Sequence, residues 1–214
     1  MITNKNLCLS IANQSFNACK SWLKQVELAE LRLDLLDFTN VELAELLSLD
    51  TSIVATCRFG NKSIPNRKEI LKLAIDLGVD YIDIELDANP DFVSEILQYA
   101  KQKSCKVILS YHNFERTPGA DQLQNIIEEA QLKRPDYIKL ATLTQTKEDN
   151  DNILKLYENY DHLIAFGMGE FGRTTRIDCL KLGAEFTYVA GKAGAETATG
   201  QYTYKEMREI LELN

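Results

Sequence analysis

The chain has 214 residues, of which 45% are hydrophobic and 26% charged, a composition ordinary for a globular protein with one sizeable core. The 32 acidic side chains outnumber the 24 basic ones and give a net charge of −8, which disfavours a phosphate backbone and argues against nucleic acid as a partner. No apolar run approaches the roughly 20 residues that a membrane span needs, and the opening MITNKNLCLS lacks the apolar region of a secretory signal.

Eight short apolar runs are candidates for strands, and helix-compatible stretches lie between them. The runs cover residues 7–12, 28–36, 52–57, 81–86, 106–111, 137–142, 163–168 and 186–191, and the helical patterns include 41–49, 67–78, 90–103, 121–133 and 147–159. Strands that alternate with helices imply a parallel sheet, and eight such units are typical of a closed barrel. We therefore predict a (β/α)8 TIM barrel, with residues 1–214 as a single domain. A doubly wound open sheet is the alternative, but the first strand–helix turn has no glycine-rich phosphate fingerprint.

The cysteines are odd in number and irregularly spaced, and none forms a Cys-x-x-Cys pair. They are Cys8, Cys19, Cys57, Cys105 and Cys179. This pattern favours reduced thiols over a disulfide framework or a zinc site. We therefore expect a cytoplasmic protein without a metal centre.

Polar residues alternate with apolar ones inside several of the predicted strands. Successive side chains of a strand point to opposite faces, and the outer face of a parallel barrel is apolar because it packs on helices. An antiparallel sheet with one solvated face would alternate similarly, but helical stretches rather than hairpins separate these strands. The polar set is therefore expected to point into the barrel; it comprises Glu30, Arg32, Asp34, Thr56, Arg58, Asp83, Glu85, Ser110, His112 and Lys139.

Two members of this set suggest chemistry. His112 ends the fifth strand, at the carboxyl end where barrel enzymes place their active sites, and histidine is the ordinary acid–base group near neutral pH. Lys139 lies within the sixth strand, where burial and neighbouring cations favour the neutral amine that attacks a carbonyl to form a Schiff base. The bland alternatives are a lysine that extends to solvent and a structural charge network. The second histidine, His162, precedes the seventh strand and is expected at the other end.

Several motifs lie on and beside these residues. They are ELRLD (30–34), TCR (56–58), IDIEL (82–86), LSYHNFERTP (109–118), YIKLAT (137–142), MGEFGRTTR (168–176) and TATGQ (197–201). In type and order these motifs resemble those of the type I 3-dehydroquinate dehydratases over nearly the whole chain. The resemblance implies a barrel that is usually a homodimer, needs no metal or cofactor, and converts 3-dehydroquinate to 3-dehydroshikimate in the shikimate pathway.

The resemblance also implies roles for individual residues. Lys139 is implied to form the Schiff base with the C3 ketone, and His112 to remove a C2 proton and then protonate the departing C1 hydroxyl. Arginine pairs well with carboxylates, and Arg176 is implied to hold that of the substrate. The residues implied to bind the substrate are Ser10, Glu30, Arg32, Arg58, Arg176, Thr197 and Gln201, and those implied to form apolar walls are Phe166, Met168 and Tyr188.

The chain departs from the family pattern at two positions. Many members carry a glutamate four residues after the arginine of the third strand, where it orients the histidine, and this chain has Lys62 there. The closing loop that usually reads SAPGQ has Thr199 at its proline position. We expect residues 192–201 to close over the substrate, with an ordinary connecting loop as the alternative.

Two other functions remain open at this point. One is a class I aldolase, another Schiff-base barrel, which would need a phosphate site near residues 189–194 and would leave Arg176 and Gln201 unexplained. The other is a degenerate barrel kept as a binding domain, which the loss of the glutamate at Lys62 permits.

Overall fold

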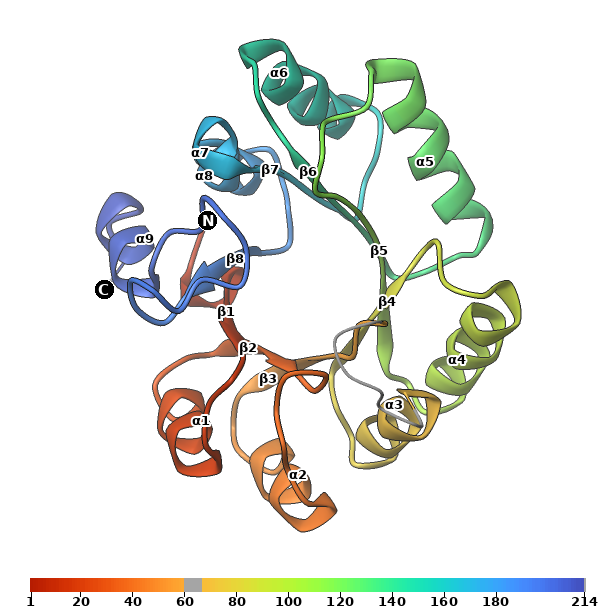
Figure 1. Ribbon diagram of the computed structural model, residues 1–214, viewed down its shortest axis with the longest axis vertical. Helices are drawn as coiled ribbons and strands as arrows, with labels where there is room; N and C mark the ends of the chain where they lie inside the picture. Colours follow the sequence, from red (N-terminus) through yellow and green to blue (C-terminus); the bar gives the residue numbers. More distant parts are fainter. Residues whose placement is uncertain (60–66, 214) are drawn as a thin grey trace.

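Eight parallel strands form one sheet in the computed structural model, which describes residues 1–59 and 67–213. The strands ring the centre of the molecule and the helices lie outside them (Figure 1). Neighbours follow the order β7-β6-β5-β4-β3-β2-β1-β8, and among the described residues no ladder joins β7 to β8. The barrel is therefore nearly closed, which confirms the predicted (β/α)8 fold over the open sheet.

Each strand but the last is followed by a helix of the outer ring before the next strand begins. The strands are β1 (Leu7–Ile11), β2 (Leu28–Arg32), β3 (Ser52–Thr56), β4 (Tyr81–Glu85), β5 (Lys106–Asn113), β6 (Tyr137–Leu143), β7 (Leu163–Met168) and β8 (Thr187–Ala190). The helices are α1 (Phe16–Leu23), α2 (Asn40–Leu47), α3 (Arg67–Asp76), α4 (Pro90–Gln102), α5 (Ala120–Leu132), α6 (Lys147–Lys155), α7 (Gly169–Gly172), α8 (Thr175–Lys181) and α9 (Tyr204–Ile210), with 3-10 turns η1 (Asn4–Asn6) and η2 (Leu156–Glu158).

The strand predicted over residues 28–36 is too long, since β2 ends at Arg32. The Arg32 guanidinium donates to both carboxylate oxygens of Asp34, at 3.0 and 2.7 Å. The amide of Leu35 donates to the Arg32 carbonyl at 2.8 Å. These bonds close a turn that takes the chain out of the sheet. The alternation runs past the true end because Leu33 still packs in the outer core, where it is 7% exposed.

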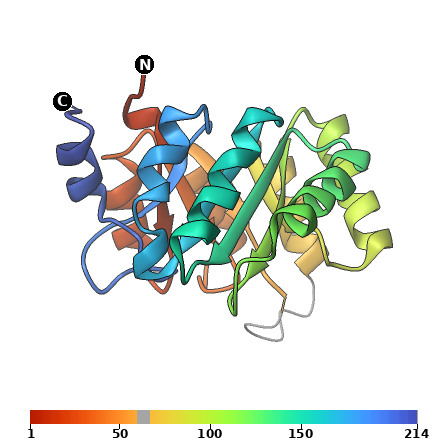
Figure 2. The same cartoon turned by 90° about the horizontal axis from the view of Figure 1, so that it is seen from above.

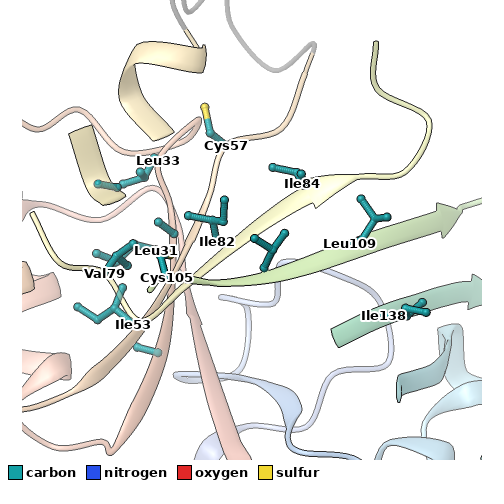
Figure 3. Packing of buried hydrophobic residues seen from close by; sticks show 14 of the residues in the cluster. Leu31, Leu33, Ile53, Cys57, Val79, Ile82, Ile84, Cys105, Leu109 and Ile138 are labelled. Atoms are coloured by element: carbon teal, nitrogen blue, oxygen red, sulfur yellow. The ribbon is translucent and has the colours of Figure 1, made fainter. Parts of the chain in front are cut away.

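The apolar face of the strands packs against the helices, as the alternation predicts. Ile82 and Ile84 of β4 and Leu109 of β5 are fully buried there, and Figure 3 shows them beside Ile138 of β6. Fully burying one such side chain contributes about 1.5–3 kcal/mol. This layer therefore dominates the stability of the barrel and fixes which side chains must face inward.

Apolar residues also fill the amino end of the barrel interior. This floor contains Tyr81, Tyr137 and Phe186, whose rings pack with centroids 6.1 Å (Tyr81–Tyr137) and 5.9 Å (Tyr81–Phe186) apart. The inward polar residues of β4, β5 and β6 lie one pleat further toward the carboxyl end. The polar layer therefore stands on a water-excluding base.

Helix starts at the carboxyl end of the barrel are set by local sequence. Helices α2, α6 and α9 begin at capping boxes, in which a threonine hydroxyl accepts from the amide three residues on and the acid there reaches back; the pairs are Thr39/Glu42, Thr146/Asp149 and Thr203/Glu206. An N-cap of this kind contributes about 1 kcal/mol. The caps thus anchor the strand–helix loops that surround the candidate site.

Both chain termini lie at the same end of the barrel (Figure 2). Across the described residues, no helix has the length and apolarity required to cross a membrane.

Candidate active site

A cavity of about 980 Å³ opens at the carboxyl ends of the strands. It brings together all the residues that the sequence analysis selected: Ser10, Glu30, Arg32, Arg58, His112, Lys139, Arg176, Thr197 and Gln201. Phe166, Met168 and Tyr188 line it too, as expected of apolar walls. Their roles remain predictions, but the geometry limits what each can do.

Lys139 lies at the bottom of the cavity and is only 4% exposed, so it does not extend to solvent. Its Nζ donates to Asp83 Oδ2 at 3.0 Å and lies 3.9 Å from Glu30 Oε1. The same Nζ stands 3.7 Å from the centroid of the Tyr188 ring, close enough for a cation–π contact. The groups nearest to the amine are thus carboxylates and an aromatic face, and not the cations expected from the sequence.

Asp83 links several inward residues and was not selected as a site residue. It is 1% exposed, accepts from Ser110 Oγ at 2.6 Å, and is paired with Arg58 Nη2 at 3.0 Å. Burial alone raises the pKa of Asp83, but the cations of Arg58 and Lys139 hold that pKa well below its ordinary value. Asp83 is therefore a permanent negative charge between two cations. Its inward parity in IDIEL was the signal that could have selected it.

Glu30 is held by two hydroxyls from neighbouring strands. Ser10 Oγ donates to Glu30 Oε2 at 2.9 Å, and Thr56 Oγ1 donates to Oε1 at 2.8 Å. These bonds fix the carboxylate beside Lys139, because each oxygen has its own donor. Ser10 thus contacts Glu30 as well as the cavity.

His112 stands at the cavity wall, one inward position beyond Lys139 on the neighbouring strand, since Ser110 pairs with Lys139 and His112 with Ala141. Phe114 stacks on the imidazole with centroids 5.9 Å apart and an interplanar angle of 15°. Burial, together with the cations of Arg58 and Lys139, lowers the pKa of His112 well below its ordinary value. The side chain is therefore a neutral imidazole, ready to accept a proton.

Arg176 reaches the cavity through the seam between β7 and β8, where no ladder closes the barrel. Its Nη1 donates to the Tyr188 carbonyl of β8 at 3.5 Å, and its guanidinium lies 4.3 Å from the Phe166 ring of β7. The residue is 0% exposed, and its Nε and Nη2 have no partner among the described residues. Burial lowers its pKa to about 10. Such a group is costly unless an anion pairs with it, so Arg176 is suited to bind a carboxylate in the cavity that it lines.

The loop over residues 192–201 is docked on the cavity rim. Thr197 donates its amide to Gln201 Oε1 at 2.8 Å, and Gln201 is 6% exposed. The amide of Gly169 donates to the Thr199 carbonyl at 3.1 Å. Gly200 has a φ of +78°, and a Cβ there would collide with the Gly169 carbonyl. A glycine is therefore required where the loop meets the start of α7.

Two other predicted positions differ in how far the structure describes them. His162 is exposed, with a φ of 55°, and its ring meets the edge of Tyr137 in the floor at 5.7 Å. It therefore lies at the end opposite the cavity, as expected. Lys62, at the position of the family's glutamate, lies outside the described residues.

Comparisons with known proteins point to one family. The family model described as type I 3-dehydroquinase matches residues 7–214. A 3-dehydroquinate dehydratase of Methanococcus maripaludis is 36% identical over 97% of this chain and 99% of its own, and one of Pyrococcus abyssi is 35% identical over 87% of each. The crystal structure of the 3-dehydroquinate dehydratase from Aquifex aeolicus superposes with a TM-score of 0.83 at 25% identity, covering 96% of this chain and 97% of that one.

Proposed function

The chain belongs to the type I 3-dehydroquinase family, and on that premise we propose that it is a 3-dehydroquinate dehydratase, a hydro-lyase that forms 3-dehydroshikimate in aromatic biosynthesis. The observation that carries this proposal is that one cavity holds both a buried lysine at its bottom and, in its wall, the guanidinium of Arg176, whose Nε and Nη2 lack a hydrogen-bond partner among the described residues. The substrate has a ketone for the first and a carboxylate for the second. A rise in absorbance from the conjugated enone product, on mixing purified protein with 3-dehydroquinate, tests the assignment.

Lys139 supplies the electron sink in the proposed reaction. The Lys139 ammonium first gives up a proton and the neutral amine adds to the C3 ketone. The carbinolamine hydroxyl then takes up a proton and leaves as water, so that a protonated Schiff base remains. The cation of that iminium takes the place of the ammonium between Asp83 and the Tyr188 ring, so its charge is stabilised at a site already built for a cation. The reaction needs no metal or cofactor, because the iminium itself withdraws the electrons.

His112 moves the proton in the proposed reaction. The neutral imidazole takes the C2 proton, and the electrons of that C–H bond flow into the iminium to form an enamine. The enamine then expels the C1 hydroxyl, which His112 protonates as it leaves as water. Hydrolysis of the new iminium releases the product and restores Lys139. One residue can serve both steps because a syn elimination keeps both groups on one face.

The binding residues are proposed to divide by charge. Arg176 holds the substrate carboxylate, with Thr197 and Gln201 closing from the loop over residues 192–201. Glu30, Arg32 and the remaining polar groups face the ring hydroxyls. Arg32 forms a salt bridge with Asp34, which neutralises its charge. Only its remaining N–H donors are therefore available to the substrate.

Replacing Arg176 by methionine should lower kcat/KM about 10- to 150-fold, mainly through KM, because a hydrogen bond to a charged group contributes about 1.5–3 kcal/mol. The same change should leave the free protein as stable or more stable, since a buried unpaired charge is exchanged for an apolar side chain. Steady-state kinetics and urea unfolding measure the two effects. Arg134→Met, an exposed arginine after α5, controls for net charge. An unchanged KM would remove Arg176 from substrate binding.

The loop over residues 192–201 should become more protected from hydrogen exchange when substrate binds, because Thr197 and Gln201 then gain partners. Gly200→Ala should raise KM several-fold, since the added Cβ undocks the loop from Gly169. Gly194→Ala is the matched control, with a φ of +83° but nothing within 4 Å of the added Cβ. It carries the backbone strain alone, about 1 kcal/mol. Equal protection with and without substrate would leave an ordinary connecting loop.

The alternative functions are weakened by Arg176. An aldolase acting on phosphorylated sugars gives no reason for a fully buried arginine in the β7–β8 seam. A degenerate barrel gives no reason to retain a costly unpaired cation. Cleavage of a phosphorylated keto-sugar, or failure to form any borohydride-trapped adduct with dehydroquinate, would favour these alternatives.

We also propose that residues 1–214 act as one catalytic domain in a cytoplasmic homodimer that binds neither nucleic acid nor membranes. The family resemblance supports the homodimer. The net charge of −8 opposes phosphate-rich partners. The five cysteines are free and buried, which suits a reducing compartment.

A further inference from the structure

The polar group that faces His112 is an arginine. Arg58 Nη2 lies 3.4 Å from His112 Nε2, a long hydrogen-bond distance. Arg58 itself is firmly held, because its Nη1 donates to Ser110 Oγ at 2.8 Å and its Nη2 pairs with Asp83 at 3.0 Å. The guanidinium is therefore not free to turn away from the imidazole, whose face Phe114 covers.

Among the described residues, the carboxylates nearest to Arg58 are Asp83 and Glu85, and both already have other partners. The position where many family members have a glutamate holds Lys62, and the stretch GNKSIPN over residues 60–66 contains no acidic residue at all. Glu85 accepts from the Phe59 amide at 3.2 Å and pairs with Arg67. Asp83 is already engaged by Lys139, Ser110 and Arg58.

We propose that Arg58 is the positioning residue of His112, holding its Nε2 as the lone-pair nitrogen and leaving the proton on Nδ1. A guanidinium can only donate hydrogen bonds and does not lose its proton in proteins. The ring nitrogen that faces it must therefore accept the hydrogen bond. The role of Arg58 in turnover rests on the proposed function. The tautomer of His112 in the free protein does not rest on it.

This arrangement has a consequence for both proton transfers. Because Arg58 also lines the cavity, a substrate oxygen can take its Nη2 donor and release the Nε2 lone pair for the C2 proton. The imidazolium so formed lies near the Arg58 guanidinium, and like charges repel; the Lys139 nitrogen is by then part of a neutral enamine. His112 therefore gives its proton up readily to the departing hydroxyl. A carboxylate partner would do the reverse and retain the proton.

The charged groups that act on His112 agree with this view. Burial has the largest effect and lowers the pKa of His112; Arg58, Lys139 and the more weakly acting Arg32 lower it further, and Asp83 opposes them. These groups come from β2, the end of β3, β4 and β6. The net result is that the neutral form persists below pH 6.5, the ordinary value.

The test uses nitrogen NMR of protein labelled in histidine, in which only two imidazole rings have to be assigned because His112 and His162 are the two histidines of the chain. His162→Gln identifies them. We expect His112 as the Nδ1–H tautomer, titrating below 6.5. In Arg58→Gln the pKa should rise by about one unit or more, as removal of a neighbouring cation predicts, and the tautomer preference should weaken. Arg58→Lys keeps the charge and should shift the pKa of His112 less than Arg58→Gln does. Arg32→Gln should also shift that pKa less.

Three results would overturn the proposal: a wild-type His112 that carries its proton on Nε2, one that titrates at or above 6.5, or an unchanged titration in Arg58→Gln. The first two need no variant, so a poorly folded variant leaves the proposal testable. In Arg58→Gln, the acid limb of the pH profile of kcat/KM should move to higher pH, together with the pKa of His112 measured by NMR. Lack of turnover by the wild type would instead count against the proposed function, since the free-protein spectra do not depend on substrate.

Discussion

Lys139→Ala is expected to abolish the adduct that borohydride traps with 3-dehydroquinate, and turnover with it. The reason is that the Lys139 amine is the only group proposed to bond to the substrate, and Lys68, which also lines the cavity, is paired with Glu95. The measurement is mass spectrometry of the intact protein and of its peptides after reduction, compared with the absorbance assay.

Lys192→Ala is the control for this result, because Lys192 is exposed on the loop after β8 and should keep the full adduct. Loss of Lys139 leaves Asp83 paired with Arg58 and bonded to Ser110, so the variant should fold. A trapped peptide that contains Lys62 or Lys192 in place of Lys139 would show that the covalent site has been assigned wrongly.

His112→Ala should slow turnover by about 10²- to 10⁴-fold, the range that a general acid–base group contributes. The variant should still form the borohydride-trapped adduct, because Lys139 and its partners Asp83 and Glu30 are untouched. Single-turnover trapping, run beside steady-state kinetics, separates the two steps.

His162→Ala is the matched control for the histidine, since it removes an imidazole from the opposite end of the barrel and should leave both rates unchanged. If His112→Ala retained most of its turnover, the proton shuttle would have to be sought elsewhere. Glu85, paired with Arg67 at the cavity edge, and Asp83 would be the groups to vary next.

Hydrophobic periodicity in the sequence predicted the barrel well. The errors concern the end of one strand and the shortest helices, where this periodicity is not informative. The inward residues that lie within strands, such as Glu30, Asp83 and Lys139, were predicted correctly because alternation along a strand is a property of the chain itself. The end of β2 was missed because Leu33 continues the apolar pattern after the Arg32–Asp34 turn has left the sheet. The short α7 and α8 went unnamed because four- and seven-residue helices show too few turns for a 3.6-residue period.

The structure brings the residues selected from the sequence into one cavity, where their roles stay predictions, but the sequence did not predict the contacts among them. Both proposed catalytic residues were identified by strand position and family motif. Asp83 was passed over because its value lies in touching Lys139 on β6 and Arg58 beyond β3, which no spacing in the sequence reveals. The same holds for the ring of Tyr188, expected as an apolar wall and found 3.7 Å from the Lys139 amine.

By itself the sequence determined the eight strand–helix units, the face that each strand turns inward and the residue types that meet at the carboxyl ends, since these follow from local periodicity and hydrophobic burial. Only the tertiary structure decided that Arg176 enters through the β7–β8 seam with its Nε and Nη2 lacking a hydrogen-bond partner among the described residues, and that the Arg58 guanidinium faces His112. Those facts depend on the register of strands far apart in the chain and on where the barrel fails to close its ladder, because a distance of a few ångströms between side chains is set by the packing of the whole sheet.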